Sequence, residues 1–492
     1  MLPSGYRVSK RVCSNIANKR SKWKSVVGLE VHAQIQSKSK LFSGAPTKFS
    51  APINSNVCLF DMAIPGTLPV LNKYCVEAGV LTALALNCQI NPVSYFDRKH
   101  YFYADMPAGY QITQQRAPLA QNGSLEFNVF TPAVHKSSYK TKVGIKQLQL
   151  EQDSGKSLHD FDRSLIDLNR AGIPLMEVVF EPDLTDGEEA AALIKELIGI
   201  LQRLQTCSCK MEEGALRVDA NVSVNKEGEP LGTRTEIKNI ASVKGIILNE
   251  TRAWNAEKKV TVPMRDKEVQ QDYRYMPEPN LPPLHIAMGP VSFGSINADK
   301  IKETLPELPE QARRRLRDEL GLTLEQSIIL VNDNDLLNIF EVALSSGPMN
   351  TILFANFLIN DLYTALNKLD LEVKDLGFKP TFLGDIVKLV EKGEISRNTA
   401  KLVLDELLKG GTNSPIEIIE KNNWKQISDE AELIKICESI INDEEKIVKD
   451  YLSGKQKAFK ALLGVVSRKT QNRANMTKCN EIFKKLLSKR IK

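Results

Sequence analysis

The sequence predicts an α+β protein in which a domain built on a mixed or antiparallel sheet precedes an all-α helical region and a small basic helical tail. From residue 25 to about residue 300, apolar and polar residues alternate between frequent glycines and prolines, a pattern typical of strands with one polar face. Beyond a proline-rich stretch that ends at Pro309, the apolar residues recur at the spacing of α-helices. The 492 residues are 42% hydrophobic, enough for several buried cores.

The N-terminal residues predict a targeting segment. Residues 1–25 contain seven lysines and arginines, five serines and no acid. This composition is typical of a mitochondrial transit peptide, whereas a secretory signal would need an apolar region. A plain disordered basic arm is the alternative. We expect a transit peptide at 1–24, an α+β domain at 25–299, a helical domain at 300–425 and the basic helical tail at 426–492.

Two segments of the first domain read as strands with a polar face. In residues 26–33, Val27, Leu29 and Val31 fall on one face, and Glu30 and His32 fall on the other. Residues 216–224 alternate in the same way and place Arg217, Asp219, Asn221 and Ser223 on the polar side, and the alternation continues through residues 235–238. Residues 186–204 look helical instead.

The helical elements that follow show clear signals. Residues 396–408 form an amphipathic segment closed by Gly410 and Gly411, a C-terminal stop signal. Residues 433–441 place apolar side chains at the spacing of a buried helix face. Residues 458–463 and 482–487 show short helical patterns in the tail. No run of about 18 apolar residues occurs, so no membrane span is expected.

The charge of the chain is divided between an acidic body and two basic ends. Residues 455–492 contain twelve lysines and arginines but one acid, Glu481. Because the whole chain carries +6, residues 26–454 are left with a net charge of −12. Contact with a nucleic-acid backbone would explain the basic tail, and a solvated face is the alternative.

No familiar nucleotide, metal or nucleophile motif is complete. Residues 153–157 end like a phosphate-binding loop, but Leu150 stands where its first glycine should be. The eight cysteines form no CxxC pair and are expected to be buried thiols in a reducing compartment.

Carboxylates on the predicted polar face indicate metal-assisted chemistry. Glu151 ends an alternating run, and Glu177 lies in an apolar segment where an unpaired charge would be costly to bury. Together with Glu30, His32 and Asp219 they could serve Mg²⁺, which binds carboxylates, waters and substrate phosphates. The alternative is that these acids are solvated or salt-bridged. The residues alone therefore leave a soluble α+β enzyme and an RNA-binding protein both open.

A series of ordered motifs resembles the family of B subunits of glutamyl-tRNA(Gln) amidotransferases, in its mitochondrial form. The motifs lie at residues 27–32, 65–72, 96–103, 150–156, 166–170, 174–178, 181–182, 217–223, 235–239 and 273–279. Family members phosphorylate the γ-carboxylate of glutamate on misacylated Glu-tRNA(Gln) with ATP and Mg²⁺. Ammonia that a separate amidase (A) subunit releases from glutamine then gives Gln-tRNA(Gln). A small C-type subunit and a mitochondrial matrix location are also implied.

The resemblance also implies roles for residues. Carried over onto this sequence, the metal and activation site comprises Glu30, His32, Glu151, Glu177 and Asp219. Of these, His32, Glu151 and Glu177 are the expected metal ligands, with His32 acting directly, through water, or by orienting the substrate, because imidazole is an unusual Mg²⁺ ligand. Three basic residues are expected either to contact phosphates or to form structural ion pairs: Arg234, Lys238 and Arg274.

Two departures from the family pattern limit what is carried over. Many members have cysteine pairs in the segment before residues 65–69. Here that segment has only Cys58, followed by Leu59, Phe60 and Asp61, so no zinc knuckle is expected there. Residues 467–475 have charges where a glycine-rich loop is usual, so detailed tail contacts are not transferred. A non-catalytic tRNA-binding scaffold remains the alternative function. A stand-alone hydrolase would need a nucleophile that the sequence does not offer.

Overall fold

The computed structural model divides the chain into two compact units, residues 1–311 and residues 312–492, which are described separately. The structure describes residues 23–492, apart from 132–133, 161, 227, 241–251, 256–259, 264–273, 290–295, 411–412, 428, 454–455, 471–472 and 492. The predicted transit peptide falls almost entirely outside the described residues.

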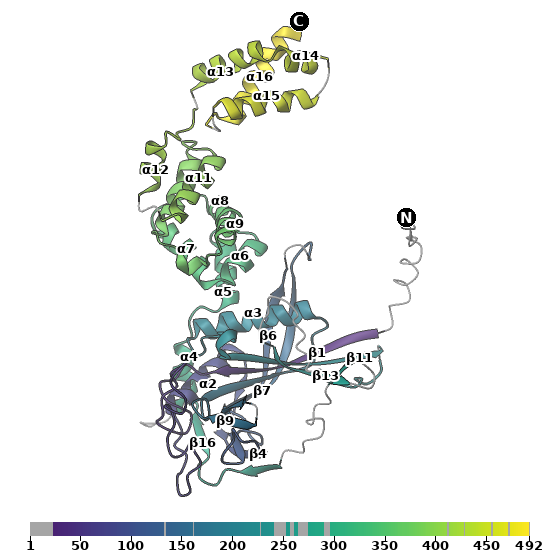
Figure 1. Cartoon of the computed structure of the whole chain (residues 1–492), viewed down its shortest axis with the longest axis vertical. Helices are drawn as coiled ribbons and strands as arrows, with labels where there is room; N and C mark the ends of the chain where they lie inside the picture. The colour runs from purple at the N-terminus through teal and green to yellow at the C-terminus, as the bar shows by residue number, and fades with distance from the viewer. Residues whose placement is uncertain are drawn as a thin grey trace. The chain divides into compact units, whose positions relative to one another are not determined.

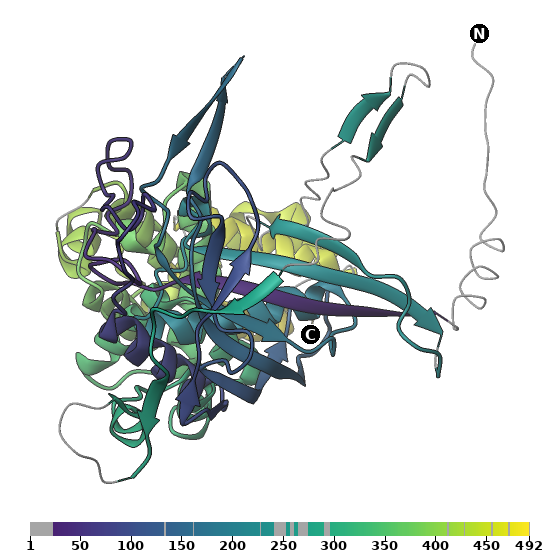
Figure 2. The same ribbon diagram turned by 90° about the horizontal axis from the view of Figure 1, so that it is seen from below.

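Unit 1 is built around an antiparallel sheet. Among the described residues it has seven strands in the order β12-β11-β1-β10-β7-β6-β2 (Figure 1). The strands are β1 (Trp23–Gln34), β2 (Gln89–Ile90), β6 (Ala120–Val129), β7 (Tyr139–Gln152), β10 (Pro174–Phe180), β11 (Leu216–Lys226) and β12 (Thr235–Ile240). β1 and β11 pair over eleven residues and extend together beyond the other strands (Figure 2). The predicted strands at 26–33 and 216–224 are thus confirmed.

In the parts of unit 1 that the structure describes, shorter strands form four smaller sheets. β15-β4-β5 and β17-β16-β3 have three strands each, and β8-β9 and β13-β14 have two. Their bounds are β3 (Val93–Ser94), β4 (Asp97–His100), β5 (Tyr110–Thr113), β8 (Lys156–Asp160), β9 (Arg163–Asp167), β13 (Arg252–Asn255), β14 (Val260–Pro263), β15 (Arg274–Pro277), β16 (Leu284–Ala287) and β17 (Ile296–Asn297).

Helices cover the apolar face of the central sheet. Helix α3 (Gly187–Arg203) begins after Asp186, whose carboxylate accepts from the Glu189 N–H, as the sequence predicts for residues 186–204. Helix α2 (Lys73–Ala85) lies in a region that the sequence predicted as strand-like, and that prediction was wrong. Its buried residues lie on most of its sides, so no amphipathic period marks it. Also in unit 1 are η1 (Met211–Glu213), α4 (Ala298–Glu303) and the start of α5 (Pro309–Asp318).

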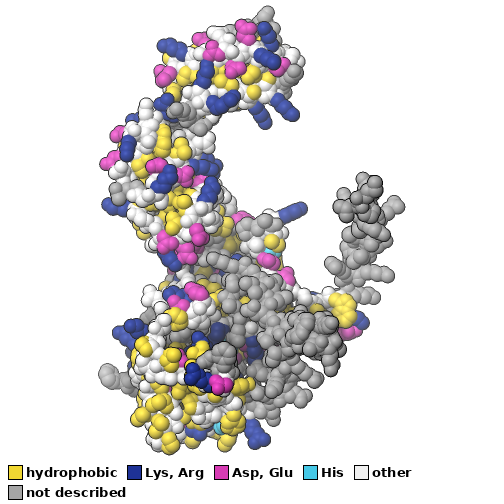
Figure 3. All heavy atoms as spheres, in the orientation of Figure 1, with side chains coloured by type: hydrophobic (Ala, Val, Ile, Leu, Met, Phe, Trp, Pro, Cys, Tyr) yellow, Lys and Arg dark blue, Asp and Glu magenta, His cyan; other side chains and the backbone are white. Residues whose placement is uncertain are grey.

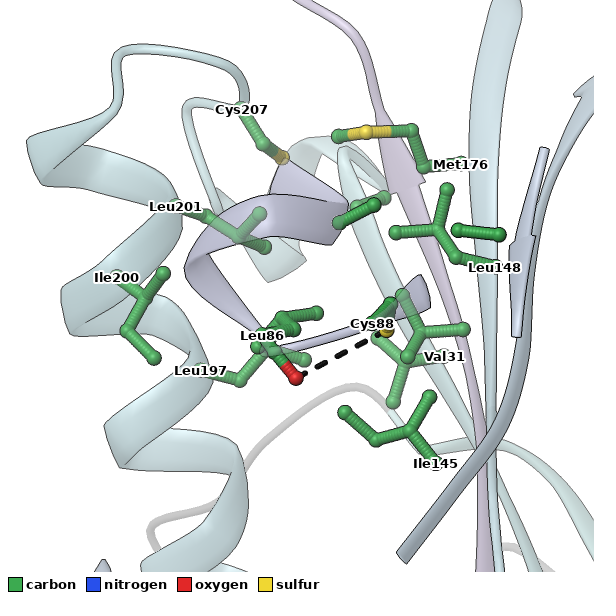
Figure 4. Packing of buried hydrophobic residues seen from close by; sticks show 14 of the residues in the cluster. Val31, Leu86, Cys88, Ile145, Leu148, Met176, Leu197, Ile200, Leu201 and Cys207 are labelled. Atoms are coloured by element: carbon green, nitrogen blue, oxygen red, sulfur yellow. Dashed lines mark hydrogen bonds between the residues drawn. The ribbon is translucent and has the colours of Figure 1, made fainter. Parts of the chain in front are cut away.

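The core of unit 1 lies between these helices and the sheet. Val31, Leu148 and Met176 of three strands are fully buried and belong to the same cluster as Leu86, at the end of α2, and Leu197 and Leu201 of α3 (Figure 4). Each such side chain stabilises the fold by roughly 1.5–3 kcal/mol. The opposite face of the sheet is therefore left for polar side chains.

The named elements in the described residues of unit 2 are all helices. Unit 2 contains the rest of α5, α6 (Leu324–Val331), α7 (Asn334–Ser345), α8 (Thr351–Asn356), the π-helix η2 (Phe357–Leu362), α9 (Tyr363–Leu369), η3 (Val373–Asp375), α10 (Thr381–Glu391), α11 (Arg397–Leu408), α12 (Pro415–Lys421), α13 (Glu430–Asp443), α14 (Glu445–Leu452), α15 (Gln456–Lys469) and α16 (Met476–Ile491). The expected α+β region with antiparallel sheets, followed by a helical region, is confirmed.

Two separate cores stabilise unit 2. One gathers apolar residues between Ala312 and Ile419, and the other gathers those between Leu433 and Leu487. In the second, the helix face predicted at 433–441 packs with side chains of α15 and α16. No helix in the described part of the chain is both long and apolar enough to cross a membrane. All seven described cysteines are free thiols. Burial is confirmed for six of them, and Cys58 is half-buried.

Candidate active site

The register of three adjacent strands brings His32, Glu151 and Glu177 together on the polar face of the central sheet. His32 of β1 lies opposite Glu177 of β10, and Glu177 lies opposite Gln149 of β7. Glu151 follows Gln149 by two residues, so both side chains point to the same face. Alternation along each strand leaves the apolar neighbours, such as Val31 and Val178, in the core.

The three side chains form a compact cluster. Each side chain offers one potential ligand atom, and these three atoms lie within 4.8 Å of one another. Among the described residues, no other set of three or more histidines, cysteines or acids is this close. His32 Nε2 and Glu177 Oε1 are 3.7 Å apart. Glu151 is only 3% exposed, and its buried Oε2 has no hydrogen-bond partner. An unpaired buried carboxylate oxygen is costly and marks a place for a ligand.

Burial disfavours the charged forms of all three side chains. It raises the pKa of Glu151, and the neighbouring charge of Glu177 raises it further. Burial likewise raises the pKa of Glu177, and the charges of Glu30 and Asp219 add to it. Burial lowers the pKa of His32, which favours the neutral imidazole that a metal requires. A divalent cation would reverse the penalty on both carboxylates by supplying positive charge between them.

The donor set fits a hard divalent cation. Two carboxylates with room for waters and substrate oxygens suit Mg²⁺, and the imidazole is the less usual member. The partnerless Glu151 Oε2 is the observation that supports a cation at this place.

Glu30 and Asp219 lie on the same face beside the cluster. They are opposite each other in the β1–β11 register, and the charge of each contributes to the raised pKa of Glu177. Glu30 Oε1 accepts a hydrogen bond of 3.0 Å from the Asn221 amide. The structure thus gathers all five predicted acidic and histidine residues on one face.

The three predicted phosphate contacts are placed differently. Lys238 is on β12, beside β11, and its Nζ lies 3.6 Å from Glu236, an ion pair on the polar face. Arg274 is exposed on β15 opposite His100, in a different sheet, and Arg234 is exposed just before β12. None of the three is in the cluster, and their roles stay predictions.

Sequence reasoning missed three residues that act on the cluster. Lys99 of β4 is close enough for its charge to lower the pKa of both Glu151 and Glu177. Gln111 of β5 donates a hydrogen bond to Glu151, and Gln149 donates one to Glu177. Gln149 could have been found from its alternation with Glu151. Lys99 and Gln111 come from another sheet. Lys99 lies within the motif at residues 96–103, whereas no motif or pattern marks Gln111.

Unit 1 also contains a cavity of about 300 Å³, and none of the three cluster residues lines it. Gln152 and Asp153, directly after Glu151, line one side, and Tyr110, directly before Gln111, also lines it. Another side is formed by the loop that contains Gly66 and Thr67. Its size and mainly polar lining suit a small polar group.

The chain is similar in sequence to known proteins over most of its length. Residues 25–291 match the GatB/GatE catalytic domain, and residues 338–487 match the GatB domain. The chain is 51% identical to the mitochondrial glutamyl-tRNA(Gln) amidotransferase B subunit of Aedes aegypti, over 96% of this chain and 94% of the relative. It is 46% identical to the corresponding human mitochondrial protein, over 95% and 89%. It is 42% identical to the aspartyl/glutamyl-tRNA(Asn/Gln) amidotransferase B subunit of Rickettsia canadensis, over 96% and 99%.

The names of the animal relatives confirm the mitochondrial location predicted from the N-terminal composition. The transit peptide itself remains a prediction, because residues 1–22 are not among those described.

Proposed function

This chain belongs to the GatB family of tRNA amidotransferase B subunits, and on that premise we propose that it converts Glu-tRNA(Gln) to Gln-tRNA(Gln) within a mitochondrial complex. The proposed partners are an A-type amidase subunit that releases ammonia from glutamine, a small C-type subunit and the misacylated tRNA. ATP is the proposed co-substrate and Mg²⁺ the proposed cofactor.

The proposed reaction solves a chemical problem, since a carboxylate is a poor acyl donor. Transfer of the γ-phosphoryl group of ATP to the side chain of the tRNA-bound glutamate creates an acyl phosphate, a carboxyl group with a good leaving group. Ammonia then attacks the carbonyl carbon, phosphate leaves, and the amide of glutamine remains. Phosphoryl transfer depends mainly on positioning and on neutralising charge.

In this reaction the residues of the chain would hold the cation that neutralises the phosphate charge, and would orient the substrate. His32, Glu151 and Glu177 would hold Mg²⁺, which when bound offsets the negative charge of the phosphates. Glu30 and Asp219, beside the cluster, would orient waters or substrate on the same polar face. Lys238 is the predicted phosphate contact that lies on this face, if its pair with Glu236 opens.

The single observation that carries the proposal is the buried cluster with a partnerless carboxylate oxygen. A protein that only held tRNA would have no need for two adjacent buried acids, each with a raised pKa.

Glu151→Ala tests this function. In the reconstituted complex it should lower the rate of Gln-tRNA(Gln) formation by at least about a hundredfold, because a ligand of the phosphoryl-transfer cation is lost. Glutamine hydrolysis by the amidase partner should continue. Glu126→Ala is the matched control, since Glu126 is exposed on β6 of the same sheet and pairs with Lys140. Near-normal amidation by Glu151→Ala would favour the non-catalytic scaffold instead.

We propose the basic tail as the part that captures tRNA. In the described part of the C-terminal helices, lysines and arginines are visible on the surface at the top of Figure 3. Lys460 of α15 and Lys484 and Lys485 of α16 are exposed. Each phosphate contact by such a residue releases counterions, which adds affinity without sequence specificity.

The structure changes how the tail must be tested. Removing residues 455–492 would delete Leu462, Val466 and Phe483 from the core shared with α13. Charge substitution at exposed positions avoids this loss. Lys484→Gln with Lys485→Gln should raise the KM for Glu-tRNA(Gln) and reduce the slope of log affinity against log salt by about two.

The control for the tail is a pair of exposed lysines elsewhere in unit 2. Lys374 and Lys409 each pair with a neighbouring glutamate, and their replacement by glutamine should change neither the KM nor the salt slope. The kcat at saturating tRNA should change much less than the KM. An unchanged tRNA affinity in the Lys484/Lys485 variant would mean that these lysines are only solvated surface residues and do not contact the tRNA.

A further inference from the structure

Gln111 holds one oxygen of Glu151 and leaves the other without a partner. The Gln111 amide nitrogen donates to Glu151 Oε1 at 2.5 Å and to the Gln152 carbonyl at 2.6 Å. The Tyr101 hydroxyl donates to the Gln111 side-chain oxygen at 3.0 Å, so the amide nitrogen must face Glu151. Both N–H groups of the amide are thereby used, and Glu151 Oε2 stays without a hydrogen-bond partner.

Gln149 does the same for Glu177. Its amide nitrogen donates to Glu177 Oε2 at 2.6 Å and to the Thr113 hydroxyl at 3.2 Å. Its own oxygen accepts a hydrogen bond from the side chain of Gln147, which again sets the direction of the amide. The other oxygen, Glu177 Oε1, is the one that lies 3.7 Å from His32 Nε2.

The two glutamines therefore divide each carboxylate into a held oxygen and an available one. We infer that Gln111 and Gln149 are positioning residues for the divalent cation, presenting Glu151 Oε2 and Glu177 Oε1 together beside His32 Nε2. This inference rests on the proposed function, because it needs a cation at the cluster. It adds two residues that act through the ligands and do not touch the cation.

The physical need for such residues follows from the like charges. Two buried carboxylates repel each other and would turn apart if their side chains were free to rotate. A hydrogen bond on the held oxygen fixes the rotation before the cation arrives, so less ordering remains to be done on binding. Both glutamines are themselves buried, Gln111 to 6% and Gln149 to 4% exposure, and each is anchored by a second bond.

A purely structural role is the competing explanation, because buried amides need partners in any protein. Gln114 offers the matched case. It is fully buried, its amide donates to the Ser94 hydroxyl at 2.6 Å, and its oxygen accepts from the Leu150 N–H at 3.0 Å. None of these bonds reaches a carboxylate of the cluster. The three glutamines differ in what they hold, and this difference can be measured.

The test compares Gln111→Met, Gln149→Met and Gln114→Met in the full chain, with Mn²⁺ alone as the probe. Methionine keeps the length of glutamine but removes its donors. The Kd for Mn²⁺ is measured from the electron paramagnetic resonance signal of the free ion, with competition by Mg²⁺. Gln111→Met and Gln149→Met should each raise the Kd about 10–100-fold, the usual effect of losing a partner that orients a ligand. Gln114→Met should keep the parent Kd.

A milder change guards against a methionine variant that fails to fold. Tyr101→Phe removes the hydroxyl that sets the direction of the Gln111 amide, and should raise the Kd in the same direction by a smaller factor. Parent affinity in Tyr101→Phe and in the folded methionine variants, or an equal loss in Gln114→Met, would overturn the inference. Absence of Mn²⁺ binding in the parent protein would overturn the metal centre itself, and the inference with it.

Discussion

Glu177 should destabilise the metal-free protein, and its replacement should reveal this. Glu177→Gln keeps the shape of the side chain, and the glutamine oxygen can still accept from Gln149. The change removes a charge that burial and the neighbouring Glu30 and Asp219 disfavour. We therefore expect unit 1 of the metal-free variant to unfold at a higher temperature than that of the parent at neutral pH.

The pH dependence of this gain follows from the raised pKa. The folded protein binds the Glu177 proton more tightly than the unfolded chain does. The free energy of unfolding of the parent therefore falls as pH rises from the ordinary pKa of a glutamate to the raised one. Glutamine does not ionise, so the advantage of the variant is fully present above this interval. It disappears as pH falls below the ordinary value of about 4.3.

A bound cation should reverse the order of stability. At a free Mn²⁺ concentration of about 100 times the Kd, binding stabilises the folded parent by roughly 2.7 kcal/mol. For a unit of this size, about 1 kcal/mol corresponds to roughly 2–4 °C, so the Tm of unit 1 should rise by about 5–10 °C. The variant lacks one of the two carboxylate ligands and should show little or no rise.

Differential scanning calorimetry with and without Mn²⁺, at two pH values, measures both effects. Unit 1 and unit 2 have separate cores, so each unfolding transition must be assigned to its unit before the shifts in Tm are interpreted. Glu126→Gln is the control for an exposed glutamate of the same sheet. A lower metal-free Tm in Glu177→Gln, or a Mn²⁺-induced rise equal to that of the parent, would refute the reasoning.

Two further predictions concern import and packing. Deletion of residues 2–22 should leave the protein in the cytosol, which cell fractionation would show. The Tm of the purified protein, measured by calorimetry, should not change, because the segment offers no apolar periodicity for a core. Continued import of the shortened protein would contradict the prediction. Gly79→Ala would place a methyl group 2.6 Å from Leu119 Cδ2 inside α2. Overpacking of about 1–3 kcal/mol should exceed the gain of about 1 kcal/mol in helix propensity. Denaturant unfolding should therefore show a lower free energy of unfolding, and a gain in stability would contradict the packing.

Local signals predicted some elements well because the physics that forms them is local. The Asp186 cap opens α3, and Ser396 caps α11, as expected from a short polar side chain before an amphipathic run. Alternation assigned Glu30 and His32 to the polar face of β1. Helix α2 was missed because its apolar residues lie on most of its sides, which leaves no period to read.

The sequence by itself determined which face each strand residue occupies, since side chains alternate strictly along a strand. It also supplied the ordered motifs that carry the resemblance. Only the tertiary structure decided which residues meet. The register places His32 against Glu177, and a slip of one residue would turn one of them into the core. Gln111 reaches Glu151 from a strand 40 positions earlier, because β5 packs against β7. Contacts of that kind depend on packing between sheets, and no local pattern of residues encodes them.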